Sequence, residues 1–237
     1  MGLRTQQIRT IIHMNMHLVS GEQCENNMWP RLRPAYTVPE GLATFEIASS
    51  YRNADKFCHF FIDDYRFERV WERPENYLDV LRRYSGVIAP DFSTYTDMPV
   101  PMQMWNAYRS RALAHYWQRE GIDVIPTIMF SDEASYDWIF DGLPKYSVLV
   151  TSSVGVYRNP EWRKSFINGM EEACKRLEPT GLIMYGTKVD FDANGAEVHW
   201  YRNDNTARAK ENYRRIQEVK DGQDDVQLRQ RRKPHRL

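Results

Sequence analysis

The stretch FCHFFI, residues 57–62, followed at once by Asp63 and Asp64, decides how this sequence of 237 residues folds. A short run of apolar and aromatic residues that stops at acidic residues is typical of a buried strand with a polar end. The same pattern returns in GVIAP, residues 86–90, which stops at Asp91. We therefore interpret the core as buried strands that each present polar residues at the carboxyl end.

Helical patterns alternate with these strands along the chain. Apolar spacing, proline starts and glycine ends predict helices over 74–84, 98–120 and 160–177. Further strands are predicted over 123–130, 147–150 and 182–185, with a short helix between the first two that ends at Phe140. Such alternation favours parallel strands joined by helices. The predicted fold is α/β with a mainly parallel sheet, either open or a partial barrel.

The two ends of the sequence lack this regular alternation. Residues 1–43 are interpreted as an N-terminal arm, 44–201 as the α/β core domain, and 202–237 as a charged C-terminal helix with a basic tail. Four further elements are expected: a short helix at 5–17, a strand at 45–48, a hairpin of 188–191 with 197–201 around Asp-Ala-Asn-Gly, and a charged helix at 205–219.

Composition narrows the class of protein. An apolar share of 42% and an aromatic share of 13% are too high for a disordered chain. Cys24, Cys58 and Cys174 show no C-x-x-C spacing, which argues against a disulfide framework and a cysteine zinc site. No run approaches the roughly 20 apolar residues of a membrane span. We expect a cytoplasmic protein that does not enter membranes.

Acidic residues follow three of the predicted strands. Because ligands bind at the carboxyl ends of parallel strands, we expect these residues to converge there. The candidate catalytic residues are Asp63, Asp91, Asp132 and Glu133. Converging carboxylates repel one another unless something compensates their charge. The compensation could be a Mg²⁺ or Mn²⁺ ion on Asp63 and Asp91, an arginine such as Arg109, or a raised pKa that suits a nucleophile or general base.

These acids also have purely structural interpretations. Asp132 and Glu133 stand where a helix begins, a place that favours acids whatever the function. Asp64 and Glu68 could form surface pairs with Arg66 or Arg69. Asp97 is expected to cap the helix at 98–120. Asp91 is the strongest candidate, because it follows an apolar strand and a proline and precedes a polar string.

A polar row on the helix at 98–120 is the second signal. Gln103, Asn106 and Arg109 are spaced three apart and share one face near the start of the helix. With Tyr95 and Ser152 they are the candidate substrate-binding residues. The alternative is that this row is the solvated face of a crossover helix.

The absence of familiar short motifs excludes several common enzyme classes, and the C-terminal tail suggests nucleic acid as a partner. The sequence contains no G-x-x-x-x-G-K-[ST], G-x-G-x-x-G, G-x-S-x-G or H-E-x-x-H. The candidate nucleic-acid-binding residues are a basic cluster, Arg229, Arg231, Arg232 and Lys233. A solvated, frayed tail is the alternative interpretation.

Several strings resemble a known family. They are HFFIDDYRFERVW at 59–71, PDFSTYTDMP at 90–99, VIPT at 124–127 and S-x-V-G-V at 152–156, together with Gln103 and W-N-x-Y-R at 105–109. This set is similar to the bacterial and phage family called domain of unknown function 4417, over roughly residues 56–186. The resemblance implies a phage or mobile-element setting and assigns no catalytic role.

Two classes of function follow from these residues. The first is an enzyme that acts on nucleotides or nucleic acid through the carboxylates at the strand ends, by metal-assisted phosphoester hydrolysis or by glycosidic chemistry with Asp91 as nucleophile. The second is a non-catalytic accessory module that binds nucleic acid or protein, with the basic tail as its contact. The chemistry and the oligomeric state stay open at this stage.

Overall fold

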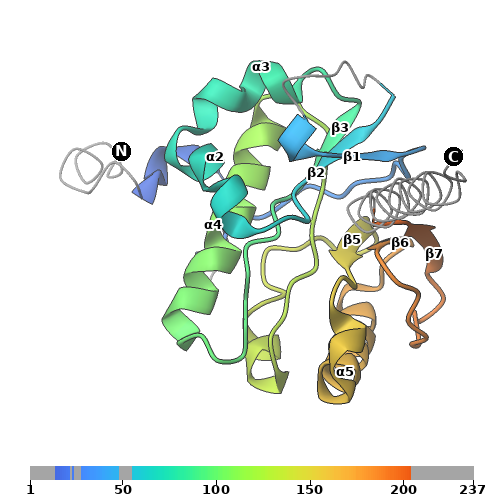
Figure 1. Ribbon diagram of the computed structural model, residues 1–237. Coiled ribbons are helices and arrows are strands. Elements are labelled where there is room, and N and C mark those ends of the chain that lie inside the picture. Colours follow the sequence, from blue (N-terminus) through green and yellow to red (C-terminus); the bar gives the residue numbers. More distant parts are fainter. Residues whose placement is uncertain (1–13, 22, 24–27, 48–54, 204–237) are drawn as a thin grey trace, which may run out of the picture. The chain divides into compact units, whose positions relative to one another are not determined.

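The structure, a computed structural model, describes residues 14–21, 23, 28–47 and 55–203 (Figure 1). The chain divides into two units, Met1–Tyr201 and Arg202–Leu237, and the elements below all belong to the first. The predicted helix at 205–219 and the basic cluster at 229–233 lie outside the described residues. The predicted helix at 5–17 also lies largely outside them, and the short 3-10 helix η2 (Met16–Leu18) overlaps its end.

Seven strands run parallel in the order in which they occur along the chain. β1 to β4 form one sheet and β5 to β7 another, and a parallel bridge between Thr127 and Val150 joins them. The strands are β1 (Leu42–Thr44), β2 (Phe57–His59), β3 (Gly86–Ile88), β4 (Val124–Ile125), β5 (Val148–Ser152), β6 (Gly181–Tyr185) and β7 (Glu197–Tyr201). The α/β prediction is confirmed, because all strand pairs are parallel and helices separate most of the strands.

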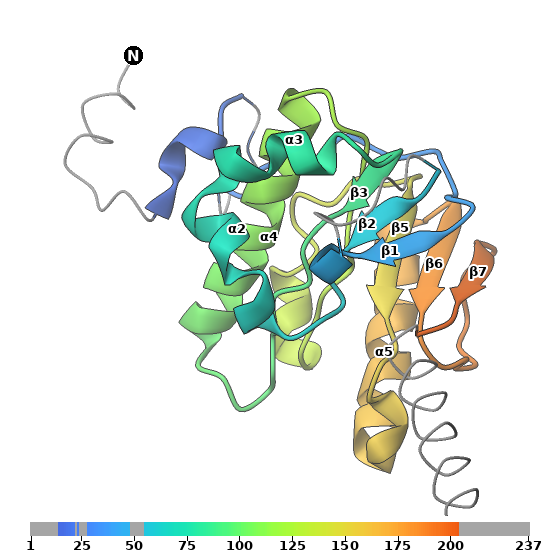
Figure 2. The ribbon, with the colours of Figure 1, turned by 45° about the horizontal axis from the view of Figure 1, so that its top comes forward.

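The helices cover the strands from outside. α2, α3 and α4 lie on one side of β1 to β3, as Figure 2 shows. α5 begins where predicted, because the Asn159 side chain accepts a hydrogen bond of 2.8 Å from the Glu161 amide and Pro160 fits the first turn. The helices are α2 (Glu68–Glu72), α3 (Leu78–Leu81), α4 (Val100–Arg119) and α5 (Pro160–Leu177), with 3-10 helices η3 (Phe45–Ile47), η4 (Asp64–Arg66), η5 (Pro74–Tyr77), η6 (Glu133–Asp137) and η7 (Val156–Arg158).

The sheet buries a second apolar cluster on the face away from the main core. This cluster collects one or two side chains from six strands, among them Leu42, Phe57, Ile88, Ile125, Val150 and Ile183, with Tyr201 of β7 packed against it. The segment before β1 crosses the same face, because Ala35 accepts from the Val148 amide at 2.8 Å and Pro39 accepts from the Tyr201 hydroxyl. β1 and β7 are not paired within the described residues, so the strands do not close a barrel.

The strand predicted at 45–48 is misplaced. β1 ends at Thr44, and Phe45–Ile47 forms the 3-10 helix η3. The turn brings the Phe45 ring against Phe60 and Tyr77, with ring centroids 4.9 and 5.6 Å away. Aromatic packing with residues distant in the sequence therefore ends the strand earlier than local propensity indicates.

The predicted hairpin at 188–201 is wrong. Glu197–Tyr201 is a strand, but it pairs in parallel with β6, and 188–191 forms no strand. The turn is present, since Asn194 and Gly195 have φ angles of 50° and 84°. The connection instead packs on α5: the Asp192 amide donates to Glu171 at 3.2 Å and the Asn194 side chain donates to the Cys174 carbonyl at 3.4 Å.

The expected cap of α4 is also wrong. The helix begins at Val100 with Pro99 in the cap position, and no side chain caps it. Asp97 is exposed in the preceding loop. Among the described helices, none combines the length and the apolar character needed to cross a membrane.

Candidate functional site

The candidate site lies where β2 and β3 end. Asp64, in the first turn after β2, accepts hydrogen bonds from the Ser93 amide at 3.0 Å and the Ser93 hydroxyl at 3.1 Å. Ser93 belongs to the loop after β3, so these bonds tie the two strand ends together. Asp91 stands two residues earlier in the same loop.

A chain of hydrogen bonds connects this loop to α4 and α2. The Asn106 side chain donates to the Ser93 carbonyl at 2.6 Å, and Arg109 donates to the Asn106 side chain at 2.6 Å. Arg109 also forms an ion pair with Glu68 at 2.5 Å and lies over the Phe92 ring at 3.9 Å. The Arg109 guanidinium therefore links the loop after β3 to α2.

Asp91 is the least compensated carboxylate of the site. It is half-buried, and within the described part of the chain its carboxylate has neither a hydrogen bond nor an ion pair. Burial first, and then the charge of Asp64, raise the pKa of Asp91 to about 7. The group therefore exchanges a proton near neutral pH, which is the property of a general acid or base.

Asp64 has a different environment. Burial raises its pKa, while the two Ser93 hydrogen bonds and the positive charge of Arg109 act in the opposite direction. Two neighbouring carboxyl groups thus differ in what stabilises their charged forms. Such a difference separates the roles of acid and base in known sites.

The polar row of α4 faces the protein interior. Gln103, Asn106 and Arg109 are 3, 6 and 7% exposed, so the row is not the solvated face of a crossover helix. Gln103 donates to the Met98 carbonyl at 2.8 Å and accepts from the Ser131 hydroxyl at 2.6 Å. The row holds together the loops that follow β3 and β4.

The other predicted acids lie elsewhere on the same side of the strands. Asp63 is exposed and pairs with Arg66 at 3.4 Å. Asp132 and Glu133 are exposed at the start of η6, and Glu133 lines a separate cavity of about 640 Å³ with residues of α5. Asp64 is the carboxylate whose charge acts on Asp91.

The described residues contain no group of three or more His, Cys, Asp and Glu side chains that could hold a metal ion. Asp63 and Asp91 therefore are not part of such a group. Mg²⁺ often binds through one or two carboxylates and the phosphates of its substrate. Binding of Mg²⁺ or Mn²⁺ by Asp63 and Asp91 stays a prediction.

Exposed aromatic residues gather in the loops after the strands. Tyr65 follows β2, Tyr95 follows β3, and Tyr157 follows β5, with exposed fractions of 74, 64 and 51%. Arginine accompanies two of them: Arg66 lies 5.5 Å from the Tyr65 ring, and Arg163 lies 5.5 Å from the Tyr157 ring. Of the predicted substrate-binding residues, Tyr95 belongs to this set. Ser152, at the end of β5, is half-buried and accepts from the Val154 amide at 3.2 Å.

Asp64 and Ser93 follow predicted strands, but the sequence placed neither them nor Glu68 among the candidate catalytic or substrate-binding residues. The adjacent pair Asp63-Asp64 marks the strand end, but only the backbone geometry decides which of the two faces Ser93. His59, at the end of β2, also received no role. It is fully buried, and burial lowers its pKa to about 3, so the ring is neutral among Phe61 and Tyr185.

Two curated relatives are proteins of mycobacterial phages. The "Gene 1 protein" of Mycobacterium phage L5 is 41% identical over 160 residues, which cover 66% of this chain and 70% of that protein. The "Gene 1 protein" of Mycobacterium phage D29 is 38% identical over 176 residues, which cover 73% of this chain and 65% of that protein. No solved structure matches the chain.

The family resemblance drawn from the strings between residues 56 and 186 is confirmed and extended. The matching segment includes the arm before β1 and reaches the residues just beyond β7. The chain belongs to the family described as Domain of unknown function (DUF4417), which it matches over residues 22–203.

Proposed function

We propose that this protein is an enzyme that cleaves a bond in a nucleotide or nucleic acid, with Asp91 as the proton-transfer group. The observation that carries the proposal is the half-buried Asp91 carboxyl, whose pKa is raised to about 7 and which has no polar partner among the described residues. A carboxyl that is only structural is normally paired or solvated. An unpaired one at the carboxyl end of a parallel strand is poised for chemistry.

The neighbours of Asp91 supply the second part of the proposal. Burial first, and then the charge of Asp64, which Ser93 holds in place, favour the protonated form of Asp91. In the protonated form Asp91 donates to a leaving-group oxygen, and in the ionised form it accepts a proton from attacking water. This exchange suits hydrolysis of a glycosidic or phosphoester bond.

The surface around the site supports the substrate class. Exposed tyrosines stack on bases, and arginines beside them pair with phosphates. Tyr157 with Arg163 offers this combination after β5, whereas Arg66 beside Tyr65 is already paired with Glu46 and Asp63. The phage origin of the relatives fits an activity on nucleic acid.

The test is an activity screen of Asp91→Asn against the parent protein. Labelled single-stranded DNA, duplex DNA, RNA and nucleotides are incubated with each protein, with and without Mg²⁺. We expect cleavage by the parent and a loss of about 100-fold or more in Asp91→Asn, the usual scale for a general acid or base. Asp97→Asn is the matched control, because it removes an exposed acid from the same loop.

Equal rates for Asp91→Asn and Asp97→Asn contradict the proposal, as does the absence of a product from every substrate. In the parent, the rate should depend on pH around 7, where Asp91 titrates. A rate that is flat through this range argues against proton transfer by Asp91.

A second candidate function is binding of nucleic acid without catalysis. It is favoured by the exposed aromatic residues with adjacent arginines, and by the basic cluster at 229–233. Tyr65→Ala with Tyr157→Ala should weaken binding of a single-stranded oligonucleotide, and removal of residues 229–237 should flatten the salt dependence. If neither change alters binding, this candidate is wrong.

A further inference from the structure

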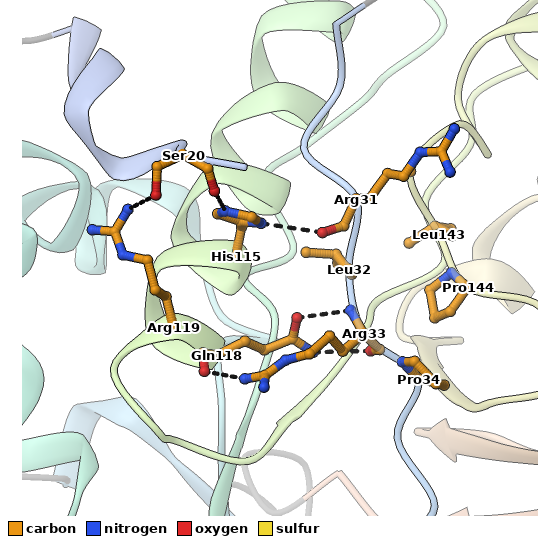
Figure 3. A pocket seen from close by; sticks show the side chains of 11 residues that line it. Ser20, Arg31, Leu32, Arg33, Pro34, His115, Gln118, Arg119, Leu143 and Pro144 are labelled. Atoms are coloured by element: carbon orange, nitrogen blue, oxygen red, sulfur yellow. Dashed lines mark hydrogen bonds between the residues drawn. The ribbon is translucent and has the colours of Figure 1, made fainter. Parts of the chain in front are cut away.

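A cluster of positive charge lies at the opposite edge of the sheet from Asp91. A cavity of about 750 Å³ is lined by the arm before β1, the last turns of α4 and the loop before β5 (Figure 3). The end of α4 leads into β4 and the loop leads into β5, so the cavity is at the amino ends of these strands. Its lining includes three arginines, Arg31, Arg33 and Arg119, together with His115, and no carboxylate lines it within the described chain.

The wall of the cavity is fixed by buried polar contacts. The Gln118 side chain, 6% exposed, accepts from the Arg33 amide at 2.8 Å and donates to the Arg33 carbonyl at 2.9 Å. On the other side of the arm, Gly142 accepts from the Leu32 amide at 2.9 Å. The arm is therefore held at two successive residues, and the side chains of Arg31 and Arg33 start from a fixed backbone.

His115 reinforces this arrangement. Its Nε2 lies 2.7 Å from the Ser20 carbonyl oxygen and its Nδ1 lies 3.1 Å from the Arg31 carbonyl oxygen. Carbonyl oxygens only accept hydrogen bonds, and a neutral imidazole has only one N–H. The ring therefore donates to at least one of these two carbonyl oxygens and links the segment at Ser20 to the arm.

The three arginines bind neutral groups or nothing. Arg119 donates to the Ser20 hydroxyl at 2.5 Å and to the Leu18 carbonyl at 3.3 Å, and Arg33 donates to the Gln118 carbonyl. Arg31 is exposed, and its guanidinium has no hydrogen bond or ion pair to any described residue. None of the three forms an ion pair with a carboxylate of the described chain.

We propose that this cavity binds a phosphate group, carried either by a nucleotide or by the backbone of a nucleic acid. Arginine is suited to phosphate because its planar fork of N–H groups donates to two oxygens at once. A phosphate that enters beside Arg31 pairs with a guanidinium that no described residue binds. The site is separate from Asp91 and does not depend on the proposed reaction.

The test measures the affinity of the full chain for inorganic phosphate by calorimetry at low salt. We expect Arg31→Gln to weaken binding about tenfold, the scale of one charge-assisted contact. Arg31→Lys, which keeps the charge but not the fork, should recover part of the loss. Arg83→Gln is the matched control, because Arg83 is an exposed arginine outside the cavity. Equal affinities in Arg31→Gln and Arg83→Gln, or no phosphate binding by the parent, overturn the proposal.

A second measurement identifies the source of the phosphate. A nucleoside monophosphate and a short single-stranded oligonucleotide each compete with inorganic phosphate. Competition by the oligonucleotide, with a salt dependence that Arg31→Gln reduces, identifies the nucleic-acid backbone. Competition by the monophosphate alone identifies a nucleotide, and competition by neither contradicts the proposal. Asp91→Asn should bind phosphate as the parent does, so failure of the proposed reaction leaves this result unaffected.

Discussion

The two ends of helix α4 lie in contrasting regions. Near its start, Gln103, Asn106 and Arg109 are buried and each finds a polar partner. Near its end, Arg119 contacts only neutral groups and faces an open cavity with Arg31. The two ends therefore have different roles. Polar groups that already have partners hold loops in place, whereas charged groups without an ionic partner mark places where a bound ligand can stabilise the protein.

Asp91 lies beside the supporting network, and its carboxylate has no polar partner among the described residues. Its replacement should therefore have the largest effect on stability. The folded pKa, about 7, lies above the ordinary value of 3.8. Between these values the folded state keeps a proton that the unfolded state releases, so stability falls as pH rises, and the whole cost is present above pH 7. Asp91→Asn should therefore be more stable than the parent above pH 7, by at most about 4 kcal/mol, and equal to it below pH 3.8.

Urea denaturation at several pH values measures this difference. Asp97→Asn is the control and should follow the parent at every pH, because Asp97 is exposed. If the free energy of unfolding depended on pH in the same way for Asp91→Asn and the parent, the pKa of Asp91 would not be raised in the folded protein.

Arg109 tests the supporting network. Arg109→Met should lower the free energy of unfolding by about 3 kcal/mol, because it leaves Asn106 and Glu68 without their partner in a partly buried place. Arg73→Met, at an exposed arginine, should change it by less than about 0.5 kcal/mol. Equal effects of the two substitutions, measured by urea denaturation, would mean that the network adds little stability.

Gly142 tests how the arginine cavity is built. Its φ angle is +83°, and an added Cβ would lie 2.6 Å from the Pro30 carbonyl oxygen. Gly195 has a φ angle of +84° with open space around it. Gly142→Ala should therefore cost about 1 to 3 kcal/mol, and more than Gly195→Ala, which carries the backbone strain without the collision. Thermal unfolding of both variants measures the difference. Equal shifts in Tm would show that the arm before β1 moves away from the added Cβ at no cost in stability.

The adjacent acids Asp63 and Asp64 give the smallest contrast. Asp63→Asn should change stability by less than about 0.5 kcal/mol, because its pair with Arg66 is at the surface. Asp64→Asn should lower the pKa of Asp91, since it removes the nearby negative charge, while burial keeps that pKa above its ordinary value. Urea denaturation measures the stability of Asp63→Asn, and carboxyl NMR titration measures the pKa of Asp91 in both variants. If only Asp63→Asn shifted that pKa, Asp63 and not Asp64 would be the carboxylate that acts on Asp91.

Local patterns predict the elements of this fold but not how distant elements pack. β2, β3 and α5 follow from apolar runs and a proline, all within a few residues. The parallel pairing of β7 does not, because the connection packs on α5 instead of closing a hairpin.

The candidate site shows the same limit. Asp91 is marked by its place after an apolar strand, and the structure then gives it the raised pKa. The choice between Asp63 and Asp64 depends on Ser93, 29 residues from Asp64. The arginine cavity depends on Gln118 and Arg33, which are 85 positions apart. Contacts over such separations leave no trace in short sequence patterns.

The crossing segment before β1 has a consequence for synthesis. Within each of the two sheets every strand pairs with the strand made just before it, so most of the pairing can form as the chain emerges from the ribosome. The contacts of Ala35 with Val148 and of Pro39 with Tyr201 must wait until β5 and β7 have been made. Residues 35–39 are thus translated before the strands that they contact, and the hydrogen bond to Pro39 cannot form in a nascent chain that stops before Tyr201.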